Sequence, residues 1–285
     1  MRARQCLRLA QSIVTVPSRL ARDQRRLRKL GLSGLRGLPF TLLAHERKLL
    51  AQINFDLLPA EFLRDADTVI DVGANRGLWS EAALRVLRPR RLLALEPSAD
   101  SYAVLAERLR GRVGTVALNL ALGDYEGRAP LYRFSRPELN SLHTPVPELE
   151  SMYGLDSEPP ETVEVGSLDR VLQDLGMLGT RISLLKLDVQ GGEMGVLKGA
   201  TVALQTTHCV VLEVLFTPHY QRSASFCDLH MFMTKKAGFT FHNFGALASD
   251  CRGRLMWADA LYVESAALTS LEAGTAEHSQ RSPWD

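Results

Sequence analysis

From Thr68 onward, short apolar runs alternate with stretches whose apolar residues recur at helical spacing. Such runs predict buried strands, and the spacing between them predicts amphipathic helices. Four helices are predicted, at Leu78–Leu87, Ser98–Leu109, Gly192–Ala203 and Ser225–Ala237. Seven strands are predicted around them, at Thr68–Asp71, Arg91–Glu96, Gly114–Asn119, Ser183–Asp188, Cys209–Phe216, Thr240–Phe244 and Ala260–Glu264. This alternation favours a Rossmann-like α/β fold, with a seven-stranded, mostly parallel sheet and helices on both faces.

The alternation is interrupted in the middle of the chain. The segment Asp124–Phe134 contains a Glu126–Gly127 turn signal between two short strand-like runs, which predicts a hairpin insertion. The next segment, Ser135–Pro160, is polar and rich in proline. Long loops in compact domains often act as lids or binding loops, so we expect a lid here.

Both ends of the chain differ from the α/β region at 67–265. Apolar residues within 1–66 recur at roughly helical spacing and predict a basic helical extension. Its basic run Arg19–Lys29 is either a solvated helical face or a weak contact with an anionic membrane surface. Residues 266–285 lack periodicity, which predicts a flexible tail.

Charge and cysteine content narrow the choice of partners and compartment. The 285-residue chain has a formal net charge of +2, but residues 1–50 carry +10 and the remainder −8. No basic stripe therefore runs through the α/β region, and nucleic acid is not expected as a partner. The four cysteines form no CxxC pair, as expected for reduced thiols of a cytoplasmic protein. No stretch is long enough to span a membrane, and the apolar part at 10–17 is too short for a signal peptide.

The most informative segment is Thr68–Ser80, where an apolar strand ends in Asp71 and a glycine-bearing turn leads into a helix. Strand, glycine turn and helix in this order form a cradle for a nucleotide cofactor. Gly73 and Gly77, on either side of Asn75, let the backbone pass close to a ligand. A carboxylate at the start of the turn suits a donor with an ammonium and a sulfonium group, such as S-adenosylmethionine.

A second carboxylate follows at the end of the next predicted strand. Glu96 comes 25 residues after Asp71, a distance that places it at the tip of the neighbouring strand, where it can accept both ribose hydroxyls of a nucleoside cofactor. The alternative is a negative charge at a helix N-terminus. No arginine follows Glu96 closely to bind a 2′-phosphate, so NADP is not expected.

The third predicted strand leads to Gly123 and Asp124, where we expect the adenine of the cofactor. Asp124 could accept a hydrogen bond from the adenine amino group. It could equally begin the predicted hairpin turn, and the sequence leaves both roles open.

The fourth predicted strand carries Lys186 and Asp188 on one side, because they are two residues apart. Asp188 lies at the carboxyl end of the strand, over the predicted crevice. A carboxylate there could orient a substrate hydroxyl or accept its proton; alternatively it caps a helix or pairs with Lys186. Glu193, in the first turn of the next helix, either joins the site or only satisfies the helix N-terminus.

Two further residues are candidates for acid–base chemistry. Glu213 lies inside an apolar run, so it must face the crevice or be paired. His219, which follows Pro218, is either a general base or a loop histidine with no role, and His143 has the same status. The candidate proton acceptors are therefore Asp188, Glu213 and His219, in that order. No residues have metal-ligand spacing, and no metal is predicted.

Taken together, these segments resemble the FkbM family of S-adenosylmethionine-dependent methyltransferases over about Val69–Val263. DVGANRG resembles the cofactor loop of the family, LEPS its ribose-binding strand end and NLALGD its adenine-side segment. LKLDVQGGEMGVLKGA looks like its most recognisable signature, ELNSL its central loop and WADALYV its last strand. The resemblance implies a class I methyltransferase fold and O-methylation of a hydroxyl on a sugar, glycan or natural product. One departure is Gln190, where many members have Glu.

Two other functions are weighed against this one. An NAD-dependent dehydrogenase of the same fold would need a GxGxxG turn, which the stretch Gly73–Gly77 lacks. A non-catalytic methyltransferase-like module could bind a glycan or a partner protein through Ser135–Pro160. The combination of Asp71, Gly73, Glu96 and Asp188 disfavours such a module, because glycan or protein binding does not require these residues. The sequence identifies neither the acceptor nor the oligomeric state.

Overall fold

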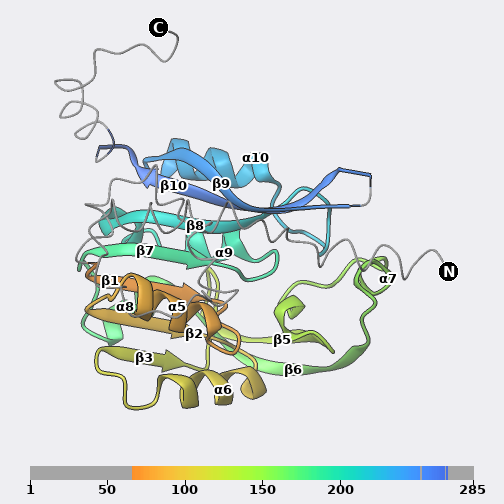
Figure 1. Cartoon of the computed structure of the whole chain (residues 1–285), viewed down its shortest axis with the longest axis horizontal. Helices are drawn as coiled ribbons and strands as arrows, with labels where there is room; N and C mark the ends of the chain where they lie inside the picture. The colour runs from red at the N-terminus through yellow and green to blue at the C-terminus, as the bar shows by residue number, and fades with distance from the viewer. Residues whose placement is uncertain (1–65, 251, 267, 269–285) are drawn as a thin grey trace, which may run out of the picture.

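The computed structural model describes residues 66–250, 252–266 and 268. In this part of the chain, seven strands form one sheet in the order β3-β2-β1-β7-β8-β10-β9 (Figure 1). The first five of these are parallel, whereas β10 is antiparallel to both of its neighbours. The predicted seven-stranded, mostly parallel α/β fold is confirmed. The predicted N-terminal helices at 1–65, and nearly all of the predicted tail, lie outside the described residues.

Each predicted strand of the sheet is present, and the two near the C-terminus are longer than predicted. The bounds are β1 Thr68–Val72, β2 Arg91–Leu95, β3 Thr115–Leu118, β7 Ile182–Leu187, β8 Thr207–Leu215, β9 Phe239–Ser249 and β10 Leu255–Glu264. All residues of β1 and β7 are buried. Central parallel strands are covered on both faces, which explains their continuous apolar runs.

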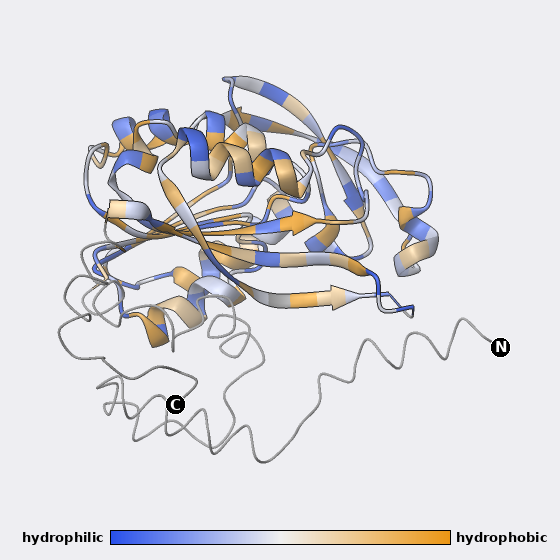
Figure 2. Ribbon diagram, turned by 90° about the horizontal axis from the view of Figure 1, so that it is seen from above, coloured by the Kyte–Doolittle hydropathy of each residue, from blue (hydrophilic) through white to orange (hydrophobic). Residues whose placement is uncertain are grey.

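Helices cover both faces of the sheet and bury a separate apolar core on each. Helices α5 (Leu78–Val86) and α6 (Ala99–Leu109) pack on the face that contains Val69. Helices α8 (Leu168–Asp174), α9 (Glu193–Lys198) and α10 (Phe226–Met231) pack on the opposite face, which contains Ile70. Figure 2 shows apolar residues concentrated in the strands and polar ones on the outer sides of the helices. None of the described helices could span a membrane.

The middle of the chain differs from the predicted hairpin and loop. A second, three-stranded sheet contains β4 (Ala121–Leu122), β5 (Gly127–Phe134) and β6 (Ser157–Gly166) in the order β4-β6-β5. β5 pairs with β6, which begins within the last residues of the predicted loop, and not with a strand inside Asp124–Phe134. The loop therefore ends at residue 156 and includes a 3₁₀ turn, η2 (Pro137–Leu139), and helix α7 (Leu149–Tyr153).

Short helical segments account for the other differences from the sequence-based expectation. Helix α8 was not predicted. Of the predicted helix Gly192–Ala203 only α9 is helical up to Lys198; a turn at 199–202 follows and leads into a 3₁₀ turn, η3 (Ala203–Thr206). The predicted helix Ser225–Ala237 continues from α10 into a π-helical turn, η4 (Phe232–Lys236). Such short segments give only a weak periodic signal.

Candidate active site

A cavity opens at the carboxyl ends of β1, β2 and β7, the edge at which open α/β sheets bind ligands. Of the predicted site residues, Gly73, Asn75, Glu96 and Asp188 line it. Its other walls come from residues 120–122, from Leu131 on β5 and from the 137–142 segment. The 137–142 segment lies within the predicted loop Ser135–Pro160, and residues 120–122 lie within the NLALGD segment. Only Leu131 was not predicted, because it comes from the second sheet, which was expected to be a local hairpin.

The turn after β1 brings the backbone against the end of β7. Gly73 has a φ of +74° and Asn75 a φ of +49°, both in the left-handed region. The N–H groups of Gly73 and Ala74 donate to the Leu95 carbonyl oxygen at 3.0 and 2.9 Å. A Cβ at position 73 would lie 1.9 Å from the carbonyl oxygen of Asp188, so only glycine fits. The cavity wall here is backbone without side-chain bulk.

Asp71 does not line this cavity. Its side chain is fully buried and accepts hydrogen bonds from Lys186 Nζ at 2.9 Å and from Ser80 Oγ at 2.6 Å. Asp71, predicted to contact a positively charged donor, thus forms an internal ion pair between β1 and β7 in this structure. The physical reason is that Lys186 is also buried and must be paired.

Lys186 stays charged inside the protein because carboxylates surround it. Burial lowers its pKa, but Asp71, Asp188 and Asp259 raise it more, so the pKa lies well above its ordinary value. Its Nζ also lies 5.5 Å from the centroid of the Trp79 ring, a cation–π distance. Lys186 thus connects the buried Asp71 to Asp188, which lines the cavity.

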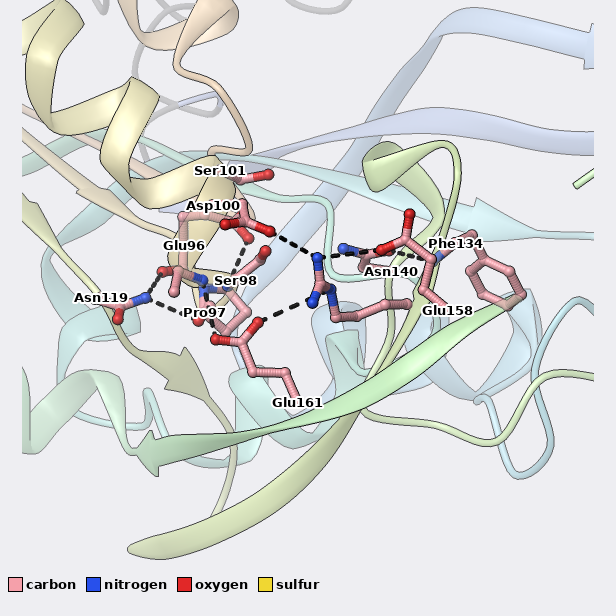
Figure 3. A network of polar contacts seen from close by, with 12 residues as sticks. Glu96, Pro97, Ser98, Asp100, Ser101, Asn119, Phe134, Asn140, Glu158 and Glu161 are labelled. Carbon is pink, nitrogen blue, oxygen red and sulfur yellow. Dashed lines mark hydrogen bonds and ion pairs between the residues drawn. The ribbon is translucent and has the colours of Figure 1, made fainter. Parts of the chain in front are cut away.

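Glu96 lies where the sequence placed it, at the end of β2 and on the cavity wall. Its Oε2 accepts from the Asn75 N–H at 2.8 Å and its Oε1 from the Ser98 N–H at 2.9 Å. Burial raises the pKa of Glu96 to about 7, and these two N–H groups oppose part of the rise. Asn119 Nδ2 donates to the carbonyl oxygens of Glu96 and Pro97 and fixes this strand end (Figure 3).

An ion-pair cluster holds the second sheet against the helix that follows Glu96 (Figure 3). Arg133, on β5, lies 2.7 Å from Asp100 in the first turn of α6 and 3.1 Å from Glu158 on β6. Glu161, also on β6, accepts from the Ala99 N–H at 3.1 Å and lies 4.0 Å from Arg133. The cluster therefore fixes β5 and β6 beside the Glu96 turn.

Asp188 lies beside Gln190, which also reaches Glu213. Gln190 Nε2 donates to Asp188 Oδ1 at 2.9 Å and to Glu213 Oε2 at 2.6 Å, and Lys186 Nζ lies 3.5 Å from Asp188 Oδ2. The Asp188 side chain is one-fifth exposed, whereas Glu213 is buried and does not line the cavity. Of these two candidate proton acceptors, only Asp188 reaches the cavity.

His219 is held in a structural role. Its Nδ1 lies 2.6 Å from the Thr217 carbonyl oxygen, so Nδ1 donates and Nε2 accepts from the Tyr153 hydroxyl at 2.6 Å. Burial lowers the pKa of His219, and the residue does not line the cavity. The structure thus places His219, a predicted general base, away from this cavity, where its ring contacts Tyr153 at the end of α7.

Glu193 likewise serves the backbone. Its Oε1 accepts from the N–H groups of Val189 and Gly191 at 3.1 and 3.2 Å, which satisfies the turn before α9. Burial raises the pKa of Glu193 to about 7, against the effect of these N–H groups. The structure thus supports the helix-terminal role for Glu193 and not direct contact with a ligand.

Gly77 allows two helices to pack and does not line the cavity. A Cβ at Gly77, whose φ is +75°, would lie 2.7 Å from Leu105 Cδ1 on α6. The conformation is one that glycine adopts without strain. Gly77 therefore lets α5 begin close to α6.

Gly123 and Asp124, which we expected beside the adenine, do not line the cavity. Gly123 is buried behind the cavity, where its N–H donates to the Gly166 carbonyl oxygen at 2.9 Å, and Asp124 is exposed. The neighbouring residues 120–122 line the cavity instead. The reason is that β4 turns the chain into the second sheet before position 123 is reached. In the described part of the chain, no three His, Cys, Asp or Glu side chains are arranged to hold a metal.

Comparison with known proteins gives a match to one family model. Residues 71–241 match the model of the methyltransferase FkbM domain. The chain is 34% identical over 155 residues to methyltransferase sdnD of Sordaria araneosa, a match that covers 46% of this chain and 59% of that protein. The chain thus aligns with little more than half the length of this relative.

Two solved structures are similar at low sequence identity. Methyltransferase FkbM of Methylobacillus flagellatus KT has 15% identity and a TM-score of 0.44, with 86% of this chain and 60% of that chain covered. The O-methyltransferase TomG of Streptomyces achromogenes, solved with S-adenosylmethionine, has 14% identity and a TM-score of 0.46, with 91% and 95% covered.

Proposed function

The chain belongs to the FkbM family of methyltransferases, and we propose that it transfers a methyl group from S-adenosylmethionine to a hydroxyl oxygen of a sugar, glycan or natural product. One observation carries the proposal. Gly73, Glu96 and Asp188, from the ends of three adjacent strands, line a single cavity. We therefore treat the alternative of a non-catalytic binding module as the hypothesis to be tested against this one.

The residues of the cavity fit the donor. Glu96, once ionised, can accept hydrogen bonds from both ribose hydroxyls, because its two oxygens have lone pairs beyond those used by Asn75 and Ser98. A Cβ at Gly73 would displace the Asp188 backbone that forms the wall, so the absence of a side chain keeps that wall open to the donor. Leu120 and Leu122 supply apolar surface for a flat base.

We propose that Asp188 accepts the proton of the hydroxyl group that is methylated. When bound, S-adenosylmethionine supplies an electrophilic methyl group on a sulfonium. A hydroxyl oxygen forms the new C–O bond more readily as its proton leaves, and the Asp188 carboxylate takes this proton. Most of the rate enhancement then comes from holding the hydroxyl in line with the methyl group.

We place the methyl acceptor beside the part of the cavity wall that the 137–142 segment forms near Asp188. The 137–142 segment lines the same cavity as Asp188 and includes Asn140, whose Oδ1 accepts from the Phe134 N–H at 3.0 Å. Ser141 is tied to the Gln190 carbonyl oxygen by a 2.7 Å hydrogen bond. A loop anchored on both sides in this way can present a fixed surface to an acceptor.

Isothermal titration of the full chain with S-adenosylmethionine is the first test. We expect the wild-type protein to bind and a Gly73→Arg variant not to bind, because the arginine side chain cannot fit beside Asp188. Candidate hydroxyl compounds are then incubated with isotopically labelled donor and analysed by mass spectrometry. Absence of donor binding to the folded wild-type protein would refute the proposal and favour the binding module.

We make two further proposals, on the location of the enzyme in the cell and on its contact with membranes. A cytoplasmic location follows from the cysteine pattern, and weak membrane contact through Arg19–Lys29 follows from its charge. The basic segment lies outside the described residues.

A further inference from the structure

Gln190 is the residue through which several separate segments meet beside Asp188. Its Nε2 carries two hydrogens, and both are used, one on Asp188 Oδ1 and one on Glu213 Oε2. Its Oε1 lies 3.0 Å from the Tyr220 hydroxyl, whose single hydrogen is shared with the Leu139 carbonyl oxygen at 2.7 Å, and its backbone carbonyl oxygen accepts from Ser141 Oγ at 2.7 Å. Gln190 therefore joins the end of β7, strand β8, the loop after β8 and the 137–142 segment.

The backbone at this position is strained. Gln190 has a φ of +56°, in a region that costs a non-glycine residue about 1 kcal/mol or more. It is followed by Gly191, where a Cβ would lie 3.2 Å from Tyr220 Cδ2. Strained residues persist when the surrounding contacts determine their conformation, and they concentrate at functional sites.

The chemistry of the site explains why an amide suits this position. Asp188 and Glu213 both accept from the same nitrogen, and ionised carboxylates are acceptors only. A glutamate at position 190 would have no hydrogen to donate when ionised and only one when protonated. An amide can donate to both carboxylates at once without adding a charge.

Resting on the proposed function, we infer that Gln190 is a positioning residue: its amide fixes the Asp188 carboxylate at the cavity wall and separates it from Glu213. Asp188 is then held toward the part of the cavity where we place the acceptor. Gln190 lines the cavity but is 6% exposed, and its side-chain contacts face the protein and not the ligand.

Other charged and titratable groups also act on Asp188. Lys186 lies on its own strand at 3.5 Å, and further groups face it from β1, α9, β8 and the loop after β8, namely Asp71, Glu193, Glu213 and Tyr220. Asp71, Glu193 and Glu213 are carboxyl groups, whereas burial raises the pKa of Tyr220 well above its ordinary range, so its phenol stays neutral. Loss of the amide donor should therefore favour the protonated form of Asp188.

The test is a pH titration of Asp188 in the full-length protein by carbon-13 NMR of labelled aspartate carboxyl carbons. The Asp188 signal is assigned with an Asp188→Asn variant. In Gln190→Met, which has a similar size and no donor, we expect the midpoint of Asp188 to rise by about one pH unit, a tenfold change in proton affinity. Gln190→Glu should raise the midpoint at least as much.

Two further variants separate this inference from a packing defect. Tyr220→Phe removes the donor to Gln190 Oε1 but keeps both amide–carboxylate bonds, so the midpoint should not move. Glu213→Gln removes a neighbouring negative charge, so the midpoint should fall. The second variant keeps the inference testable if Gln190→Met does not fold.

A kinetic measurement adds an independent readout. With an acceptor found by the labelling experiment, Gln190→Met should lower the transfer rate by about tenfold or more, as expected for a misplaced proton acceptor. Its dissociation constant for the donor should change less than about twofold. If Gln190→Met and Glu213→Gln titrate like the wild type, the inference is overturned. If the wild type binds no donor, the proposed function fails while the titration still decides the role of Gln190.

Discussion

Replacing Gly73 by alanine should be far more harmful than the loss of one hydrogen atom suggests. The new Cβ would lie 1.9 Å from the carbonyl oxygen of Asp188 and 2.8 Å from its carbonyl carbon. Both atoms belong to the backbone, so no side chain can rotate away. The turn after β1 and the end of β7 must separate, and these two segments form the cavity wall.

The magnitude follows from two contributions. Alanine at a φ of +74° costs about 1–2 kcal/mol, and the forced separation adds about 1–3 kcal/mol, as in overpacked cores. We therefore expect the free energy of unfolding to fall by roughly 2–5 kcal/mol. Displacement of the wall should also weaken binding of S-adenosylmethionine by about tenfold or more.

Gly176→Ala is the matched control. Gly176 also has a positive φ, +66°, but a Cβ there would have no heavy atom within 4 Å. This variant should lose only the conformational contribution of about 1–2 kcal/mol and should bind the donor normally. Urea unfolding and isothermal titration measure both quantities. Equal destabilisation in the two variants, with normal donor binding in Gly73→Ala, would refute the clash argument.

Three further variants test other parts of the site. Lys186→Met leaves the buried carboxylate of Asp71 without its cation, so the free energy of unfolding should fall by about 3–5 kcal/mol in urea. A loss below about 1 kcal/mol would argue against a buried ion pair. Glu96 has a pKa near 7 in the folded protein and 4.5 ordinarily, so the unfolded chain loses this proton first and wild-type stability should fall as pH rises between these values. Glu96→Gln should show a smaller fall between pH 5 and pH 8; an unchanged fall would contradict the assignment. Arg133→Met should weaken donor binding a few-fold by loosening the segment beside Glu96, whereas Arg110→Met, which breaks an exposed pair with Glu107, should not. Equal effects of the two arginine variants in isothermal titration would exclude a local role for the cluster.

The predicted cradle residues that line the cavity are those whose signal in the sequence is local. Gly73 and Glu96 belong to short segments in which a strand, a turn and a helix follow one another, and these segments place them on the cavity wall. Asp71 and His219 were predicted by the same kind of reasoning, but neither lines this cavity. Both are buried among partners that lie 115 and 66 residues away in the chain, Lys186 and Tyr153. Nothing in the neighbouring sequence shows that these partners exist.

The alternation of apolar runs with helical spacing determined the α/β sheet by itself, because burial on both faces requires apolar residues throughout each central strand. The glycine of the first turn was also set locally, since the chain there must adopt a positive φ. Only the tertiary structure decided which carboxylate faces the cavity. Asp71 and Asp188 both lie at the carboxyl ends of apolar strands. Lys186 forms a buried ion pair with Asp71, while Gln190 holds Asp188 at the surface of the cavity. The cost of burying an unpaired charge makes this choice, and it depends on contacts between segments far apart in the chain.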